Sequence, residues 1–235
     1  MLILDRVVKH YPAGGGEVIR ALDGVSLTIE PGELIALYGP SGSGKTTLLE
    51  IIAALLVADA GRVLIDGRNL ATLSKREAQR YRRIDLGYIS QSPELLPGVK
   101  AIDNAALKLL GTGANPREAR ELVTPMLARL GLADRLDHRP NELSAGQRQR
   151  VLIARALSTN PRLVLADEPT GNLDSHRSRE VLSLLTELCM EREIAMLLVT
   201  HDPEAAGFAT RVHSLQDGRV SQNGVPDVVD ATHRG

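Results

Sequence analysis

The chain has 235 residues, 24% of them charged, and its 28 lysines and arginines against 29 aspartates and glutamates leave a formal net charge of -1. This balance argues against the basic surface that DNA- and RNA-binding domains use, so no nucleic-acid partner is expected. A single cysteine, Cys189, cannot form a disulfide within the chain, which favours a reducing cytoplasm.

No stretch of the sequence is apolar enough to cross a bilayer as a helix. The longest apolar run, from Ile51 to Ala58, is far shorter than the roughly 20 residues that a spanning helix needs. The N-terminus has no basic segment followed by a long apolar one, so it does not resemble a signal peptide. We therefore expect a soluble cytoplasmic protein whose membrane-spanning partner, if it has one, is another polypeptide.

The first part of the chain predicts strands, one glycine-rich loop and one apolar helix. Alternating or continuous apolar residues predict strands at 2–11, 25–29, 34–38, 63–65 and 86–90. The composition of residues 12–16 predicts a loop, and Asp66-Gly67 predicts a tight turn. An apolar helix is expected from Lys45 to Val57.

From about residue 101 to 141 the pattern changes to helices. Asn115 followed by Pro116 and Glu118 predicts a helix start, and Gly131 predicts the end of that helix. Continuous apolar runs at 163–166 and 196–199 then predict buried parallel strands. Residues 212–220 predict a hairpin, and the polar tail at 223–235 is expected to be frayed. The fold class is therefore α/β, with one domain at 1–222 and a helical insert at about 100–142.

A phosphate-binding loop follows the strand at 34–38. The eight residues Gly39-Pro40-Ser41-Gly42-Ser43-Gly44-Lys45-Thr46 match the pattern G-x-x-x-x-G-K-[ST] with no deviation. Glycines let backbone N–H groups approach phosphate oxygens, and the helix that starts at Lys45 directs the positive end of its dipole at the anion. Lys45 is expected to reach the β- and γ-phosphates, and the Thr46 hydroxyl to bind Mg²⁺. Thr47 belongs to the same helix start.

Two acids end the apolar strand at 163–166. A buried strand of an open α/β sheet delivers its last side chains to the edge where ligands bind. Asp167 is therefore placed to hold Mg²⁺, and Glu168 is the candidate general base for the attacking water.

The segment Leu143-Ser144-Ala145-Gly146-Gln147 resembles the signature of ABC transporter ATPases, and the other motifs of that family follow in order. Tyr11 is similar to the aromatic residue that stacks on adenine, Gln91 to the Q-loop glutamine and His201 to the switch histidine. Asn172-Leu173-Asp174 resembles the D-loop. The resemblance covers about residues 2–220 and implies a RecA-like P-loop NTPase core with an antiparallel β subdomain.

The resemblance also implies roles and partners. ATP and Mg²⁺ are the expected ligands, with Gln91 contacting both the metal and the water, and His201 contacting the γ-phosphate. In this family the signature, here Ser144 to Gln147, faces the γ-phosphate held by the other subunit, which implies a homodimer or a heterodimer with a similar ATPase. A transmembrane permease is the further partner, which implies a peripheral location on the inner face of the cell membrane.

One residue departs from the family pattern. Ala145 occupies a signature position where the family usually has glycine. If φ of this residue is negative, the added methyl group costs little. If φ is positive, the cost is about 1 kcal/mol or more and contact with phosphate suffers.

The sequence also favours a branch within the family. Residues 11–22 and 167–175 look most similar to the macrolide-exporter, lipoprotein-release and cell-division ATPases, which work with large permeases. Importer ATPases usually add a regulatory C-terminal domain, for which this chain has no room. Two other classes stay open: an ABC ATPase of translation or DNA repair, and a catalytically inactive regulator. The first usually carries two cassettes or a long insertion, and intact Glu168 and His201 argue against the second.

Overall fold

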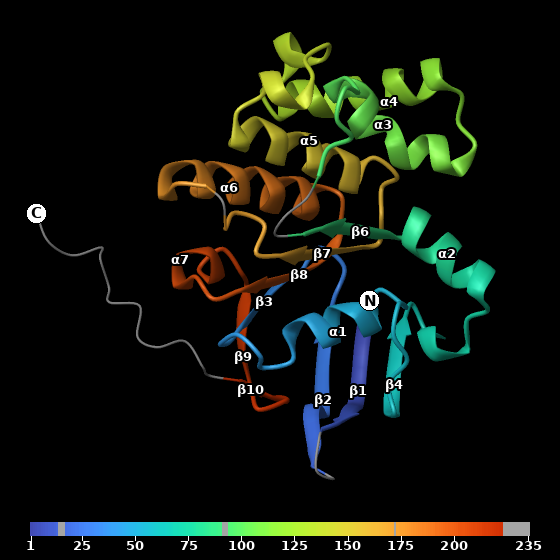
Figure 1. The fold of residues 1–235 in the computed structure, drawn as a ribbon, viewed down its shortest axis with the longest axis vertical. Coiled ribbons are helices and arrows are strands. Elements are labelled where there is room, and N and C mark those ends of the chain that lie inside the picture. Colours follow the sequence, from blue (N-terminus) through green and yellow to red (C-terminus); the bar gives the residue numbers. More distant parts are fainter. Residues whose placement is uncertain (14–16, 91–93, 172, 223–235) are drawn as a thin grey trace, which may run out of the picture.

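We describe the fold from a computed structural model, which places residues 1–13, 17–90, 94–171 and 173–222. Two sheets and a group of helices form the molecule (Figure 1). The smaller sheet is antiparallel and has the order β2-β1-β4-β5. Its strands are β1 (Leu2–Pro12), β2 (Val18–Ile29), β4 (Ala60–Ile65) and β5 (Arg68–Asn69).

The larger sheet is mostly parallel and has the order β10-β9-β3-β8-β7-β6. The edge strand β10 is antiparallel to its neighbour β9, and the other five strands run parallel to one another. The strands are β3 (Leu34–Tyr38), β6 (Leu86–Ile89), β7 (Leu163–Asp167), β8 (Ala195–Thr200), β9 (Arg211–Gln216) and β10 (Arg219–Gln222). The predicted strands and the hairpin about Asp217-Gly218 are confirmed as elements, but β2 begins at Val18 and β4 at Ala60, earlier than the predicted 25 and 63.

Helices cover the larger sheet and also pack on one another. They are α1 (Lys45–Ile52), α2 (Lys75–Ile84), α3 (Ala101–Thr112), α4 (Pro116–Arg129), α5 (Ala145–Leu157), α6 (Ser175–Glu191) and α7 (Pro203–Ala206). Short 3₁₀ turns lie at Leu70–Thr72, Ala133–Arg135 and Pro140–Glu142. Figure 1 shows α3 and α4 beyond α5, on the side of α5 away from the antiparallel sheet. None of the helices within the described ranges is long and apolar enough to cross a bilayer.

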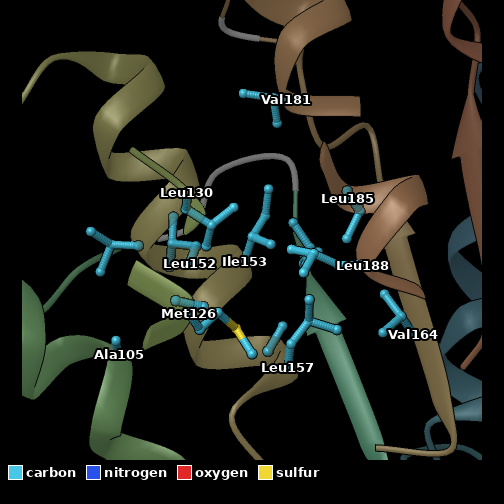
Figure 2. Close-up of a cluster of buried hydrophobic side chains, with 14 of the residues drawn as sticks. Ala105, Met126, Leu130, Leu152, Ile153, Leu157, Val164, Val181, Leu185 and Leu188 are labelled. Carbon is cyan, nitrogen blue, oxygen red and sulfur yellow. The ribbon is translucent and has the colours of Figure 1, made fainter. Parts of the chain in front are cut away.

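Two hydrophobic cores lie on opposite faces of the larger sheet, because alternate residues of each buried strand point in opposite directions. In β7, Val164 and Ala166 pack with the helices α3 to α6, while Leu163 and Leu165 pack with α1 and the antiparallel sheet. Figure 2 shows the first core, where side chains such as Ile153 and Leu185 meet between helices and sheet. Burial on both faces explains why these strands read as continuous apolar runs.

The predicted helix at 45–57 is wrong at its end, because α1 stops at Ile52. Ala54 has a φ of 51°, which takes the chain out of the helix. Contacts from α2 satisfy the carbonyl groups left at this end: the Tyr81 hydroxyl donates to Ile52 O (3.0 Å) and Arg82 Nη1 donates to Ala54 O (2.7 Å). Apolar composition cannot reveal a stop that a distant helix stabilises.

Candidate active site

Three neighbouring parallel strands bring the candidate catalytic side chains to one edge of the larger sheet. The phosphate loop follows β3, Asp167 ends β7 with Glu168 directly after it, and His201 follows β8 between them. The register pairs Tyr38 with Thr200 and Asp167 with Val199, so the three strands end at the same level. The meeting of these motifs at one edge therefore follows from the strand order.

The phosphate loop is wedged tightly between two other backbones. A Cβ atom on Gly39 would lie 2.3 Å from Leu215 O, and one on Gly44, whose φ is 105°, would lie 2.1 Å from Ala21 O. Glycine is therefore required at both positions for space, and at Gly44 also for conformation. The loop backbone ends directly at the N-terminus of α1, whose first turn holds no acidic residue. This arrangement suits an anion.

Two polar groups of the loop, the Ser43 hydroxyl and the Lys45 ammonium group, could bind phosphate oxygens. The Ser43 hydroxyl is buried and has no hydrogen-bond partner within the part of the chain that the structure describes. Lys45 Nζ donates to the carbonyl oxygens of Gly39 and Pro40, at 2.7 Å each. Burial lowers the pKa of Lys45, and the charges of Glu168 and Asp167 oppose that shift. The loop therefore fits a phosphate chain, which supplies both negative charge and acceptor oxygens.

Glu168 is held in a fixed position by the end of β8. Its Oε1 accepts from His201 N (2.9 Å) and lies 2.5 Å from His201 Nδ1, and its Oε2 accepts from Thr200 Oγ1 (3.1 Å). The residue is buried and has a φ of 47°, a conformation that costs a non-glycine residue about 1 kcal/mol or more. Such a conformation persists only where surrounding bonds fix it, and these three contacts do so.

Asp167 lies in a half-buried position beside Glu168. Burial raises its pKa, the charge of Glu168 raises it further, and the charge of Lys45 lowers it. Removing two adjacent carboxylates from water is unfavourable unless a cation compensates them. Thr46 and Asp167 offer oxygen donors, which Mg²⁺ prefers. Within the described ranges no group of three histidine, cysteine or acidic side chains forms a metal site by itself.

A groove of about 1470 Å³ joins these residues to the antiparallel sheet. Its lining includes most of the phosphate loop together with Thr47, Asp167, Glu168 and His201, and it contains Tyr11 at the end of β1. Gly39 and Ser43 of the loop do not line it. Lys9 Nζ lies 5.7 Å from the centroid of the Tyr11 ring. An aromatic ring, a phosphate loop and an acid pair therefore line the same groove.

The other walls of the groove were not predicted from the sequence. Val18, Ile19 and Arg20 of β2 form one wall, and residues 216–221 of the β9–β10 hairpin form another. Ile19 is opposite Tyr11 in the β1–β2 register. The sequence could have located it only through a prediction that the first two strands pair in this register. Asp23 holds the hairpin in place, because its N–H donates to Gly218 O and its carboxylate accepts from Arg219.

The signature segment and Asp174 do not line this groove. Ser144 caps α5 by accepting from Gln147 N (3.2 Å), while Gln147 Oε1 accepts from Ser144 N (2.9 Å). This capping box confirms the predicted helix start. Ala145 is the first helical residue and is not among the residues with positive φ, so its methyl group costs little. Gln91 and Asn172 lie outside the described residues.

Comparison with known proteins identifies the family. The family model described as ABC transporter matches residues 22–171. The chain belongs to the ABC transporter family. It is 42% identical to the lipoprotein-releasing system ATP-binding protein LolD 2 of Chlorobaculum tepidum, over 95% of this chain and 93% of the relative. It is 43% identical to the macrolide export ATP-binding/permease protein MacB of Burkholderia pseudomallei, over 94% of this chain and 33% of that longer protein.

Solved structures agree with the family assignment. A dimeric structure of the bacterial ABC transporter cassette MJ0796 superposes with a TM-score of 0.84 at 39% identity, over 94% of this chain and 97% of the other. A post-hydrolysis dimer of the same cassette, bound to ADP and Pi, has a TM-score of 0.83 at 37% identity, over 96% of this chain and 100% of the other. This ABC transporter ATPase therefore binds and hydrolyses ATP on an α/β P-loop fold, as the sequence predicted.

Proposed function

We propose that this ATPase works as a dimer that binds two ATP molecules between its copies and drives a separate membrane permease. One observation carries the proposal. The signature helix begins outside the groove that contains the phosphate loop, although a helix start with no acidic residue in its first turn is itself suited to an anion. A second copy, placed head to tail, would bring Ser144 and Gly146 to the ATP held by the first. The dimeric form of the similar cassette supports this arrangement.

In the proposed reaction Glu168 acts as general base for the water that attacks the γ-phosphate. Its carboxylate is already oriented by Thr200 and His201. His201 would turn its exposed ring from Glu168 toward the γ-phosphate, and Lys45 would exchange its loop carbonyls for phosphate oxygens. Tyr11 would stack on adenine. Gln91 and Asp174 keep the roles expected from the resemblance, as ligands from the Q-loop and D-loop.

Mg²⁺ would be held by Thr46, Asp167 and Gln91 together with phosphate oxygens. Bound there, it would neutralise charge that develops on the phosphates during transfer. The raised pKa of Asp167 supports a cation beside this carboxylate, because a cation would restore the charged form.

We further propose that the permease is a separate polypeptide and that the ATPase is peripheral to the inner face of the membrane. The partner of an ATPase similar to LolD and MacB would be an exporter or a mechanical system acting on lipoproteins, peptides or drugs. A test is to purify the tagged Glu168→Gln chain with ATP from detergent-solubilised membranes of its own host, and then to reconstitute the retained permease with the parental chain, which can hydrolyse ATP. ATP-driven release of a lipoprotein or efflux of a macrolide would support the proposal. Reconstituted permease that moves neither, or no permease at all, would contradict it.

The shared site is tested by mixing two damaged chains, Lys45→Ala and Ser144→Arg. Each homodimer has two damaged sites. If sites are shared between copies, the heterodimer has one site with both lesions and one intact site, so ATPase activity returns on mixing. If Ser144 serves its own chain, every heterodimer site carries one lesion and nothing returns. Ser74→Arg is the matched control, because Ser74 forms the same kind of capping box on α2, outside the groove.

A further inference from the structure

Arg177 lies directly beside the start of the signature helix, on the first turn of α6. A Cβ atom on Gly146 would lie 3.7 Å from Arg177 Cδ. The Arg177 side chain is 57% exposed, and its Nη1 lies 3.3 Å from Asp174 Oδ2. A guanidinium group thus lies between the signature helix and the residue that resembles the D-loop aspartate, on a side chain that none of the sequence motifs includes.

This guanidinium is weakly engaged within the described part of the chain. Its contact with Asp174 is longer than the roughly 2.7–2.9 Å that is usual for a strong charge-assisted hydrogen bond. Arg179, two residues further along α6, instead pairs with both carboxylate oxygens of Glu204 at 3.0 and 3.1 Å. An arginine has five N–H donors in a fork that suits phosphate, so Arg177 retains donors for another anion.

Helix stability does not explain an arginine at this position. Asp174 caps α6 and Arg177 is the third residue of the helix, where a cation opposes the helix dipole. In α2, α4 and α5 the same position is occupied by Glu77, Glu118 and Gln147, each of which suits a capped helix start. A residue that opposes local stability beside a candidate site is expected where function requires it.

We propose that Arg177 is a further residue of the shared nucleotide site and that its guanidinium contacts a phosphate of the ATP bound in the partner copy. This inference rests on the head-to-tail dimer proposed above. When the copies close on ATP, the side chain exchanges its weak contact with Asp174 for phosphate oxygens. Arg177 would therefore supply positive charge to the partner's ATP beside Ser144 and Gly146, while leaving nucleotide binding to its own groove unchanged.

The first test compares Arg177→Ala with Arg179→Ala as a matched control on the same helix. We expect Arg177→Ala to lower the ATPase rate about tenfold and to weaken ATP-dependent dimerisation in the Glu168→Gln background by a similar factor. Binding of a fluorescent, non-hydrolysable ATP analogue to the monomer should stay within twofold. Arg179→Ala should leave all three quantities within twofold. Equal effects of the two substitutions would overturn the assignment.

A charge reversal separates this role from a structural one. Arg177→Glu places an acid at the third position of a helix capped by Asp174, which favours the helix, so the melting temperature should equal or exceed that of the parent. The ATPase rate should nevertheless fall at least fiftyfold. A variant that melts lower and hydrolyses ATP normally would show that Arg177 serves only the surface of α6.

The mixing assay then tests action on the partner. Arg177→Glu mixed with Lys45→Ala should recover activity to the same extent as the Ser144→Arg and Lys45→Ala pair. If the Ser144→Arg pair recovers and the Arg177→Glu pair does not, Arg177 does not act across the dimer and the inference fails alone. If neither pair recovers although heterodimers form, the head-to-tail dimer itself is wrong and the inference falls with it.

Discussion

Glu168→Gln should separate ATP binding from ATP hydrolysis. The substitution keeps the shape of the side chain, and the remaining carbonyl oxygen can still accept from His201 N as Oε1 does now. The new amide can donate to Thr200 Oγ1, which lies 3.1 Å from Oε2. Because these contacts survive, the end of β8 should stay in place and the groove should keep its geometry.

The magnitude follows from the loss of the base. General-base catalysis contributes about 10²–10⁴-fold, so the barrier to hydrolysis should rise by about 2.7–5.5 kcal/mol. The substitution also removes one of two neighbouring negative charges, which should lower the pKa of Asp167 because the charge of Glu168 raises it. ATP affinity should therefore be unchanged or higher.

The assay is size-exclusion chromatography with ATP and Mg²⁺, combined with a phosphate-release measurement. We expect a stable dimer that retains two ATP molecules, and a turnover rate at least about 100-fold below that of the parent. Glu204→Gln is the matched control, because Glu204 is exposed on α7 outside the groove. A Glu168→Gln chain that stays monomeric at high concentration, or that hydrolyses ATP at the parental rate, would refute the assignment of the base.

Three further predictions concern the loop, the signature and a buried histidine. Lys45→Ala should weaken ATP binding by about 2–4 kcal/mol, because it removes a charge-assisted phosphate contact, and unchanged affinity in a fluorescent-analogue titration would contradict the site. Ala145→Gly should leave the ATPase rate within about twofold and lower the free energy of unfolding by at most about 1 kcal/mol, since Ala145 is helical; a large gain in rate would show that the methyl group hinders phosphate contact. His213 is buried, its ring nitrogens have no hydrogen-bond partner among the described residues, and burial lowers its pKa below the usual 6.5. The folded state therefore binds this proton less readily than the unfolded state, so stability is full above about pH 6.5 and falls as the pH drops below it. Urea unfolding between about pH 7.5 and 5 should show this fall, and His213→Leu should reduce it; an equal slope in both chains would assign the proton to another group.

Local patterns in the sequence determined the chemistry of this protein. The glycines and Lys45 of the phosphate loop, the acids that end β7 and the cap at Ser144 each depend on neighbours within a few residues, so their structure could be predicted in advance. Continuous apolar runs identified β7 and β8 as buried parallel strands because both of their faces are covered. The sequence prediction did not include α2 or α6 as helices.

Only the tertiary structure decided how these pieces combine. The order β3-β8-β7 places His201 between the phosphate loop and Glu168, and no local pattern encodes which strands become neighbours. Long-range pairing also forms the groove walls from β2 and the β9–β10 hairpin, and α2 fixes the end of α1. The position of Arg177 beside Gly146 likewise depends on the packing of α5 on α6, because residues about 30 positions apart meet only when two helices do.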